Sequence, residues 1–242
     1  MAKSNISDIL RNNSYPGRGI CIGLTPDGKK IAVAYFIMGR SENSRNRVFV
    51  AEGNDLRTKA FDDSKLTDPS LIIYYPVRTL EEGLIVTNGD QTDTIFDFVN
   101  DGMTFENALN TRQFEPDSPN FTPRISGIVK IEDGDASYKL SILKTSEGDA
   151  NTSNRYYFDF DMLSKGCGHF IHTYQSDGDP LPSFEGEPRR IEIQDSIDGF
   201  CNEIWNSLNN ENKVSLFVRY ININSREFET RIRNVHGSEV GK

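Results

Sequence analysis

The chain is poor in cysteine, histidine and tryptophan, and it has no long apolar stretch. Its 242 residues include three cysteines, three histidines and one tryptophan. An odd number of widely spaced cysteines, at positions 21, 167 and 201, argues against a disulfide framework and fits a reducing compartment. No apolar run approaches the roughly 20 residues of a membrane span, and residues 1–13 lack a signal-peptide core. The sequence therefore predicts a soluble, cytoplasmic protein.

Positive charge is also scarce. Thirty-six acidic residues against 27 basic ones give a net charge of −9. Non-specific nucleic-acid binding and anionic-membrane binding both need a basic surface, so we expect neither partner. The length suffices for one large domain with a sizeable core. Because no repeat, linker or shift in composition marks a boundary, we expect a single domain over residues 1–242.

Arginine is nevertheless concentrated in one short segment, residues 39–47. It holds Arg40, Arg45 and Arg47 together with Asn46, and it lies between the apolar runs 31–38 and 48–50. A guanidinium presents a planar fork of donors that matches phosphate or carboxylate oxygens. The segment is therefore either an anion cradle, most plausibly for a phosphorylated small molecule, or a solvated polar loop of the kind that most charge clusters form.

Apolar runs separated by turn residues predict strands in hairpin order, with helices grouped in three places. We expect strands at 20–24, 31–38, 48–51, 71–75, 84–86, 125–131, 138–143, 156–160, 166–174, 214–223 and 226–235. We expect helices near 6–10, 94–99, 105–109 and 195–208. This order predicts an α+β fold in which two stacked antiparallel sheets are flanked by helices.

A metal site is suggested by His169 and His172, with Cys167 nearby. If this run is a strand, the two histidines point to opposite faces, because side chains alternate along a strand. Only Cys167 and His169 would then share a face, and two ligands do not make a site. We therefore predict no metal centre.

Four polar segments stand at the expected ends of strands, where a rigid sheet can present them to a substrate. They are Tyr-Pro-Gly-Arg-Gly at 15–19, Gly-Arg-Ser-x-x-Ser-Arg-Asn-Arg at 39–47, Thr-Asn-Gly-Asp-Gln-Thr-Asp at 87–93 and Thr-Pro-Arg-Ile-Ser-Gly at 122–127. In this order, and along most of the chain, the set resembles the archaeal-type inosine monophosphate (IMP) cyclohydrolase family.

The resemblance implies a four-layered αββα sandwich like that of the N-terminal nucleophile hydrolases, without their self-cleavage. It also implies the last step of purine synthesis, in which 5-formamidoimidazole-4-carboxamide ribonucleotide closes its ring to IMP and loses water. The implied partner is this purine ribonucleotide, and no metal, cofactor or covalent intermediate is required. A homo-oligomer is left open.

The resemblance also implies roles for particular side chains. Arg40, Arg45, Asn46 and Arg47 would hold the 5′-phosphate, Tyr15 and Arg18 would line the neighbouring wall, Asn88 and Asp90 would handle the carboxamide and formyl groups, and Arg124 would donate to a carbonyl or the phosphate. Tyr74 is a candidate proton donor, and Glu185 is a candidate ribose or proton-transfer carboxylate.

Each of these residues has a simpler explanation. The segment around Asn88 has ordinary turn chemistry, the tyrosines fit a core, and Glu185 stands near Arg189 and Arg190, which would make a surface ion pair.

Two other functions stay open at this point. A non-catalytic nucleotide-binding protein of the same fold would keep the cradle without the chemistry. An amidohydrolase would use Cys21 as its nucleophile. The enzymes of the implied fold need that nucleophile at a freed N-terminus, and twenty residues precede Cys21 here.

Overall fold

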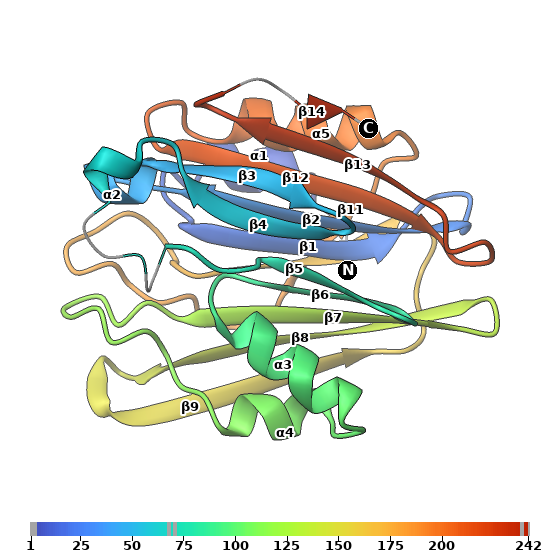
Figure 1. Cartoon of the computed structure of the whole chain (residues 1–242), viewed down its shortest axis with the longest axis horizontal. Helices are drawn as coiled ribbons and strands as arrows, with labels where there is room; N and C mark the ends of the chain where they lie inside the picture. The colour runs from blue at the N-terminus through green and yellow to red at the C-terminus, as the bar shows by residue number, and fades with distance from the viewer. Residues whose placement is uncertain (1–3, 67–68, 70–71, 238–239, 242) are drawn as a thin grey trace.

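The computed structural model describes residues 4–66, 69, 72–237 and 240–241. They form two antiparallel sheets of seven strands each, stacked face to face with helices on both outer sides (Figure 1). The predicted αββα sandwich is confirmed. No helix among these residues is long and apolar enough to cross a membrane.

The first sheet combines strands from both ends of the chain. β1 and β2 form a hairpin, and β12 pairs with β2 while β10 pairs with β1. In spatial order the strands are β11 (Arg189–Glu192), β10 (Cys167–His172), β1 (Arg18–Leu24), β2 (Lys30–Met38), β12 (Lys213–Asn222), β13 (Phe228–Asn234) and β14 (Val240–Gly241).

The second sheet follows the order of the sequence. Each strand pairs with the next one along the chain, which makes a long antiparallel meander. Its strands are β3 (Arg47–Glu52), β4 (Asp55–Ala60), β5 (Val77–Leu80), β6 (Gly83–Thr87), β7 (Arg124–Glu132), β8 (Asp135–Ser146) and β9 (Asp149–Phe160).

Helices cover the outer face of each sheet. α1 (Ile6–Arg11) and α5 (Ile197–Ser207) pack on the first sheet, and α3 (Gln91–Asn100) and α4 (Phe105–Asn110) pack on the second (Figure 1). A central core between the sheets and two outer cores under the helices bury the apolar side chains. The predicted tandem helices and the predicted stripe on the last helix are confirmed.

One predicted strand is wrong. The sequence favours a strand at 71–75, but residues 72–74 form turns and bends, and the fifth strand begins after Pro76. Leu71 lies outside the described residues. The Thr58 hydroxyl donates to the carbonyl oxygens of Ile72 at 2.6 Å and Tyr74 at 3.0 Å, so this stretch is held by a side chain of β4.

The arginine segment contains a helical turn rather than a loop alone. Ser41 caps α2 (Glu42–Arg45), and Ser44 closes the reciprocal capping box. The turn therefore has its own local hydrogen bonds, which fix where Arg45 and Arg47 leave the backbone.

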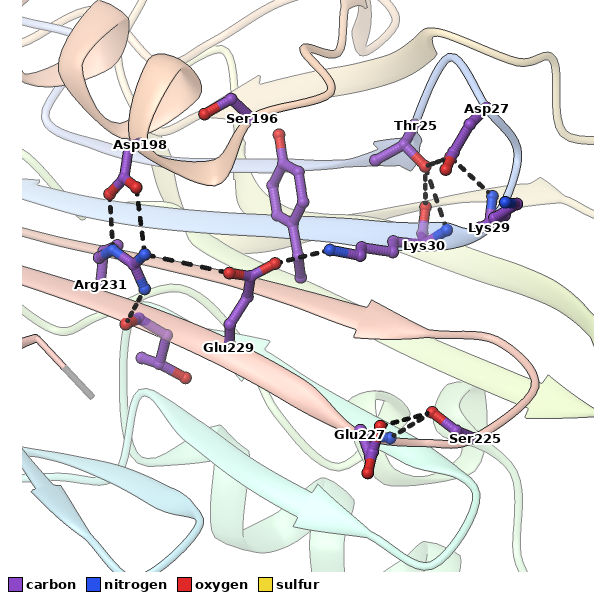
Figure 2. Close-up of polar contacts among 12 residues, drawn as sticks. Thr25, Asp27, Lys29, Lys30, Ser196, Asp198, Ser225, Glu227, Glu229 and Arg231 are labelled. Carbon is purple, nitrogen blue, oxygen red and sulfur yellow. Dashed lines mark hydrogen bonds and ion pairs between the residues drawn. The ribbon is translucent and has the colours of Figure 1, made fainter.

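Charged side chains connect the first sheet to its helix layer (Figure 2). Glu229 on β13 pairs with Lys30 on β2 at 2.7 Å, and Arg231 on β13 pairs with Asp198 on α5 at 2.6 Å. These contacts join three elements that are distant in sequence. Each pair is partly exposed to solvent, which screens the charges, so its contribution to stability is small.

Candidate active site

All four polar segments come together where three strands of the two sheets begin and at the turn that starts α3. Arg18 opens β1, Arg47 opens β3 and Arg124 opens β7. Glu115 lies in the connection between α4 and β7, and the charges of all three guanidiniums act to lower its pKa. We call Arg18, Arg47, Arg124 and Glu115 the arginine–glutamate cluster.

Arg47 is the most deeply buried of these arginines, with a side chain only 1% exposed. Its Nε donates to the Ser44 carbonyl oxygen at 2.9 Å, and its Nη2 has no partner among the described residues. Burial, and then the charge of Arg18, lower the pKa of Arg47, yet a guanidinium stays protonated in proteins. A buried cation with an unused donor is suited to an anionic ligand.

Two tyrosine hydroxyls lie beside Arg47. The hydroxyl groups of Tyr35 on β2 and Tyr74 are 2.9 Å apart and buried. Burial raises the pKa of both, so both keep their protons at neutral pH and at least one can donate to a ligand. Tyr74, the proton donor suggested by the sequence, thus lies next to the arginine–glutamate cluster.

Glu115 is the one carboxylate buried among these cations, with 6% of its surface exposed. Its backbone N–H donates to the Thr122 carbonyl oxygen at 2.9 Å, which holds it beside the start of β7. Burial raises the pKa of Glu115 to about 7, although the charges of Arg124 and Arg18 oppose the rise. A carboxylate with this pKa can accept and return a proton near neutral pH.

Arg124 is fixed by the turn that precedes α3. Its Nη1 donates to Gln91 Oε1 at 2.6 Å and lies 2.6 Å from Asp90 Oδ1. Gly89 leaves the room for this arrangement, because a Cβ at that position would lie 2.4 Å from Arg124 Nη1 and 3.4 Å from Glu115 Oε1. Any side chain at 89 would displace these side-chain ends from their present positions.

The pKa of Asp90 is lowered, whereas that of Glu115 is raised. The Asp90 carboxylate also pairs with Arg112, and about half of its side chain is exposed. Partial burial raises the pKa of Asp90, but the hydrogen bond from Arg112 and the charge of Arg124 outweigh it and bring the pKa below its ordinary value. A carboxylate that holds protons so weakly is a poor base, and Asp90 is placed to orient Arg124.

The first segment reaches the cluster through stacked tyrosines. The rings of Tyr15 and Tyr174 lie 5.9 Å apart and nearly parallel, and Thr122 Oγ1 lies 2.5 Å from the Tyr174 hydroxyl. Burial lowers the pKa of Arg18, but interaction with Tyr15 and Tyr174 raises it, so both tyrosines lie near this guanidinium. Gly17 makes this possible, because its φ is +76° and a Cβ there would lie 2.4 Å from the Tyr174 ring.

The side-chain amides of two predicted site residues form hydrogen bonds within the protein. Asn88 Nδ2 donates to the Pro123 carbonyl oxygen at 2.9 Å, and its Oδ1 accepts from Ile125 N and Gln91 Nε2. Asn46 forms a two-way bridge to the backbone of Asp62. These amides hold the segments in place and have little capacity left for a substrate.

Three further predicted residues lie outside the cluster. Arg40 is exposed, stands over the Tyr15 ring at 5.1 Å and pairs with Asp177 at 2.7 Å. Arg45 donates to the Gly39 carbonyl oxygen at 2.9 Å. Glu185 is exposed and lines a different groove beside Lys144. The structure thus brings together Arg18, Arg47, Arg124, Asp90, Tyr15 and Tyr74, and it leaves these three at the rim or beyond.

The amidohydrolase alternative is contradicted by the position of Cys21. This side chain is 1% exposed in β1, in the core between the first sheet and its helices. Burial raises the pKa of the Cys21 thiol far above its ordinary value, so it stays protonated. It is neither a freed N-terminus nor part of the cluster.

Glu115, Tyr35 and Tyr174 are absent from the prediction made from the sequence. Tyr35 is in an apolar strand and Tyr174 follows one, which makes both resemble core residues. Glu115 is in a turn-rich stretch with no motif. The one available signal was that arginines gathered in an acidic chain need a counter-charge, and this does not say which of the 36 acids supplies it.

No group of three or more metal-ligating His, Cys, Asp or Glu side chains occurs within the described part of the chain. His169 and His172 are on β10, as expected for opposite faces: His169 Nδ1 lies 2.6 Å from the Tyr138 hydroxyl, and His172 Nδ1 lies 2.8 Å from the Tyr174 carbonyl oxygen.

A family model and individual relatives all match this chain under closely similar names. The model of a family described as IMP cyclohydrolase-like protein matches residues 15–226, a span that contains all four polar segments. The IMP cyclohydrolase of Methanopyrus kandleri is 32% identical over 184 residues, which cover 71% of this chain and 89% of that protein.

Two further relatives bear the same name. The IMP cyclohydrolase of Methanothrix thermoacetophila is 33% identical over 176 residues, covering 71% of this chain and 80% of its own length. That of Methanosphaera stadtmanae is 32% identical over 123 residues, covering 49% and 59%. The family model spans most of the chain, and the cluster lies within the matched residues. The chain belongs to the IMP cyclohydrolase-like family.

Proposed function

We propose that this protein is an IMP cyclohydrolase that closes the ring of 5-formamidoimidazole-4-carboxamide ribonucleotide to IMP. Three relatives carry this name, and the family model matches residues 15–226. The observation that carries the proposal within the structure is Glu115, a carboxylate with a pKa of about 7 buried beside three arginines.

The chemistry defines what the site must supply. The carboxamide nitrogen attacks the formyl carbon, a carbon–nitrogen bond forms, and the formyl oxygen becomes the hydroxyl of a tetrahedral carbinolamine. Loss of that hydroxyl with a ring N–H proton releases water. The amide nitrogen is a poor nucleophile because its lone pair is delocalised. The reaction therefore needs a folded substrate, a proton acceptor and donors for the developing oxyanion.

In our proposal Glu115 is the proton acceptor. Its ionised form takes a proton from the carboxamide nitrogen as the ring closes and delivers it to the formyl oxygen, which becomes the hydroxyl. It then takes the ring N–H proton and delivers it to that hydroxyl, which leaves as water. One group can serve both steps because its pKa of about 7 lies close to working pH. The resemblance gives Asn88 and Asp90 the handling of the carboxamide and formyl groups and does not say which residue is the base. The hydrogen bonds of the Asn88 amide and the lowered pKa of Asp90 favour Glu115 as the proton acceptor.

Arg18 and Arg47 are proposed to hold the 5′-phosphate. Neither forms an ion pair with a carboxylate among the described residues, and Arg47 has an unused donor. A phosphate dianion neutralises two guanidiniums, which a neutral carbonyl group cannot do. The protonated hydroxyls of Tyr35 and Tyr74 lie near Arg47 and would add donors.

Arg124 is proposed to stabilise the charge that develops on the formyl oxygen. Of the three cations, Arg124 has the largest effect on the pKa of Glu115. Contacts with Asp90 and Gln91 fix the orientation of its guanidinium. A donor held rigidly before the reaction begins need not reorganise in the transition state. Asp90 is thus a positioning residue in this proposal.

We also propose the cytoplasm as the location, since all three cysteines are free thiols and the substrate is a small purine ribonucleotide.

The test is to incubate the purified protein with the formamido ribonucleotide and to follow the absorbance change that accompanies formation of IMP. We expect turnover. Retained nucleotide binding without turnover would overturn the proposal in favour of a non-catalytic binding protein. The matched control is Glu187→Gln, which changes an exposed acid outside the cluster and should leave turnover intact.

A further inference from the structure

We infer that β9 pairs antiparallel with β9 of a second copy of this chain, which makes a dimer with one continuous sheet across the interface. This inference is independent of the proposed function. It starts from the order of the second sheet, in which β9 is the last strand and has a neighbour, β8, on one side only. Its outer edge therefore presents a row of backbone donors and acceptors.

The length of this edge is unusual for the molecule. β9 has 12 residues and contains neither proline nor glycine. The edge strands of the first sheet, β11 and β14, have four and two residues. The register between β8 and β9 shifts between Thr145 and Ser146, which leaves residues 150–152 as a bulge near the hairpin turn and makes residues 153–160 the regular part of the edge. Natural proteins protect long edges with proline, a bulge, lysine or a covering element. No backbone hydrogen bond from residues 153–160 to any element but β8 is found among the described residues.

The opposite edge of the same sheet is treated differently. On β3, the backbone N–H of Phe49 donates to Asn234 Oδ1 at 2.8 Å, and the Phe49 carbonyl oxygen accepts from Asn234 Nδ2 at 3.1 Å. A side chain of β13 thus occupies the free backbone groups of Phe49 near the middle of β3. The contrast leaves β9 as the long, unoccupied edge of the sandwich.

When two copies of β9 lie antiparallel, their side chains can be complementary. If a two-fold axis passes through Tyr157, Arg155 of one copy lies opposite Asp159 of the other, and the reverse pair repeats on the far side of the axis. Opposite charges in directly facing positions stabilise an antiparallel pair. An axis through Arg155 would instead place two arginines opposite each other.

The same axis also matches the apolar side chains. It places Tyr156 opposite Phe158 twice, on the face of β9 that is turned toward the other sheet. Tyr156 is 44% exposed in the single chain, and Phe158 only partly packs against the central core. Facing aromatic pairs stabilise strand association. An axis through residue 152 would pair Arg155 with Asp149 but would not place aromatic residues opposite each other. Of these three axes, only the one through Tyr157 gives both the opposite-charge pairs and the aromatic pairs.

Existing contacts leave the charged groups able to pair across the axis. Arg155 uses Nε and Nη2 to bind the carbonyl oxygens of Leu109 and Arg112 at the end of α4. Asp159 uses Oδ2, which lies 3.1 Å from Lys139. Nη1 of Arg155 and Oδ1 of Asp159 are not used in these bonds, and both side chains are already held on the outer face of the strand.

The test uses the full chain and measures molar mass by light scattering and by sedimentation at several concentrations. The wild type should be a dimer. Arg155→Asp and Asp159→Arg should each weaken association at least tenfold, because each homodimer then contains facing like charges. Mixing the two variants should restore the dimer, since the mixed pair has an arginine opposite an aspartate at both positions.

The control is Asp149→Arg, which makes the same change on the same strand outside the pairs of the Tyr157 axis and should leave association unchanged. Tyr156→Lys offers a variant that keeps the contacts of Arg155 with α4, and it should also weaken association at least tenfold. Circular dichroism checks that each variant is folded. A monomeric wild type, or a dimer that survives both charge reversals and Tyr156→Lys, would overturn the inference.

Discussion

Glu115 shows how burial can outweigh attraction at the scale of one residue. Three guanidiniums act on it, and nearby cations normally lower the pKa of a carboxyl group. Loss of hydration is the larger effect here and brings the pKa of Glu115 to about 7. The residue is therefore ionised in only part of the molecules at neutral pH.

A first prediction concerns activity. Because the ionised form of Glu115 is the proposed proton acceptor, kcat/KM of the wild type should rise as pH increases through about 7. Glu115→Gln should lower kcat at least 100-fold and remove this rise. The measurement is a pH profile of IMP formation from pH 5 to 9. Full activity in Glu115→Gln would assign the proton transfer to another group.

A second prediction concerns stability. The pKa of Glu115 is raised from 4.5 in a solvated chain to about 7 in the fold, so the unfolded chain loses the proton first. Stability contributed by this group therefore falls as pH rises from about 4.5 to about 7. Glu115→Gln should be more stable than the wild type at pH 8 and equal to it at pH 4. Urea unfolding at both pH values checks this, and an equal difference at both would contradict it.

A third prediction separates the two arginines of one segment. Arg47 is buried with an unused donor, whereas Arg45 is exposed and bound to Gly39. Arg47→Ala should weaken nucleotide binding at least tenfold, and Arg45→Ala should change it less than twofold. Calorimetric titration with IMP measures both. Equal losses in the two variants would mean that the phosphate lies at the rim.

At the scale of elements, α5 is the helix whose sequence and packing agree best. Ser196 caps its start by accepting from Gly199 N, and Ile197, Phe200, Cys201 and Ile204 form the buried stripe. The stripe packs on the first sheet, where Phe200 and Tyr220 have ring centroids 6.4 Å apart. Here local propensity, capping and tertiary contacts specify the same structure.

The stripe leads to a fourth prediction. Phe200 is fully buried, so Phe200→Ala should cost about 3–5 kcal/mol of unfolding free energy through lost burial and a cavity. Asn206 is exposed on the same helix, and Asn206→Ala should change stability by no more than about 0.5 kcal/mol. Urea unfolding of both variants tests the assignment; similar costs would show that α5 is not anchored by this stripe.

At the scale of the whole molecule, the first sheet is what unites the chain. β1 and β2 come from the first 40 residues, yet they pair with β10 and β12 from the last 80. The second sheet is built from the residues between and packs on the first through one central core. Neither sheet can form its inner face without the other.

This arrangement gives a fifth prediction. The chain should unfold in urea as one cooperative unit, because loss of either sheet exposes the shared core. Far-UV circular dichroism should change together with the fluorescence of Trp205, which lies on α5 and packs against the outer core of the first sheet. Added IMP should move both transitions to higher urea by the same amount. Two separate transitions would indicate two domains.

The sequence by itself determined the strands with clear apolar patterns, the presence of the helices, the two-sheet fold and the family. These features depend on neighbouring residues, on alternation along a strand or on segments that keep their order. It failed at 71–75, where an apolar run bonds to Thr58 instead of joining a ladder. Apolar character indicates burial, and burial does not require a strand.

Only the tertiary structure decided which polar residues lie together in the candidate site. It left Arg45 and Glu185 outside, committed Asn46 and Asn88 to backbone bonds, and added Glu115 from a stretch without a motif. The physical reason is that a raised pKa and an unused buried donor arise from desolvation and from neighbours distant in sequence. Residue type alone sets what a side chain can do, and the fold sets what remains free for a ligand.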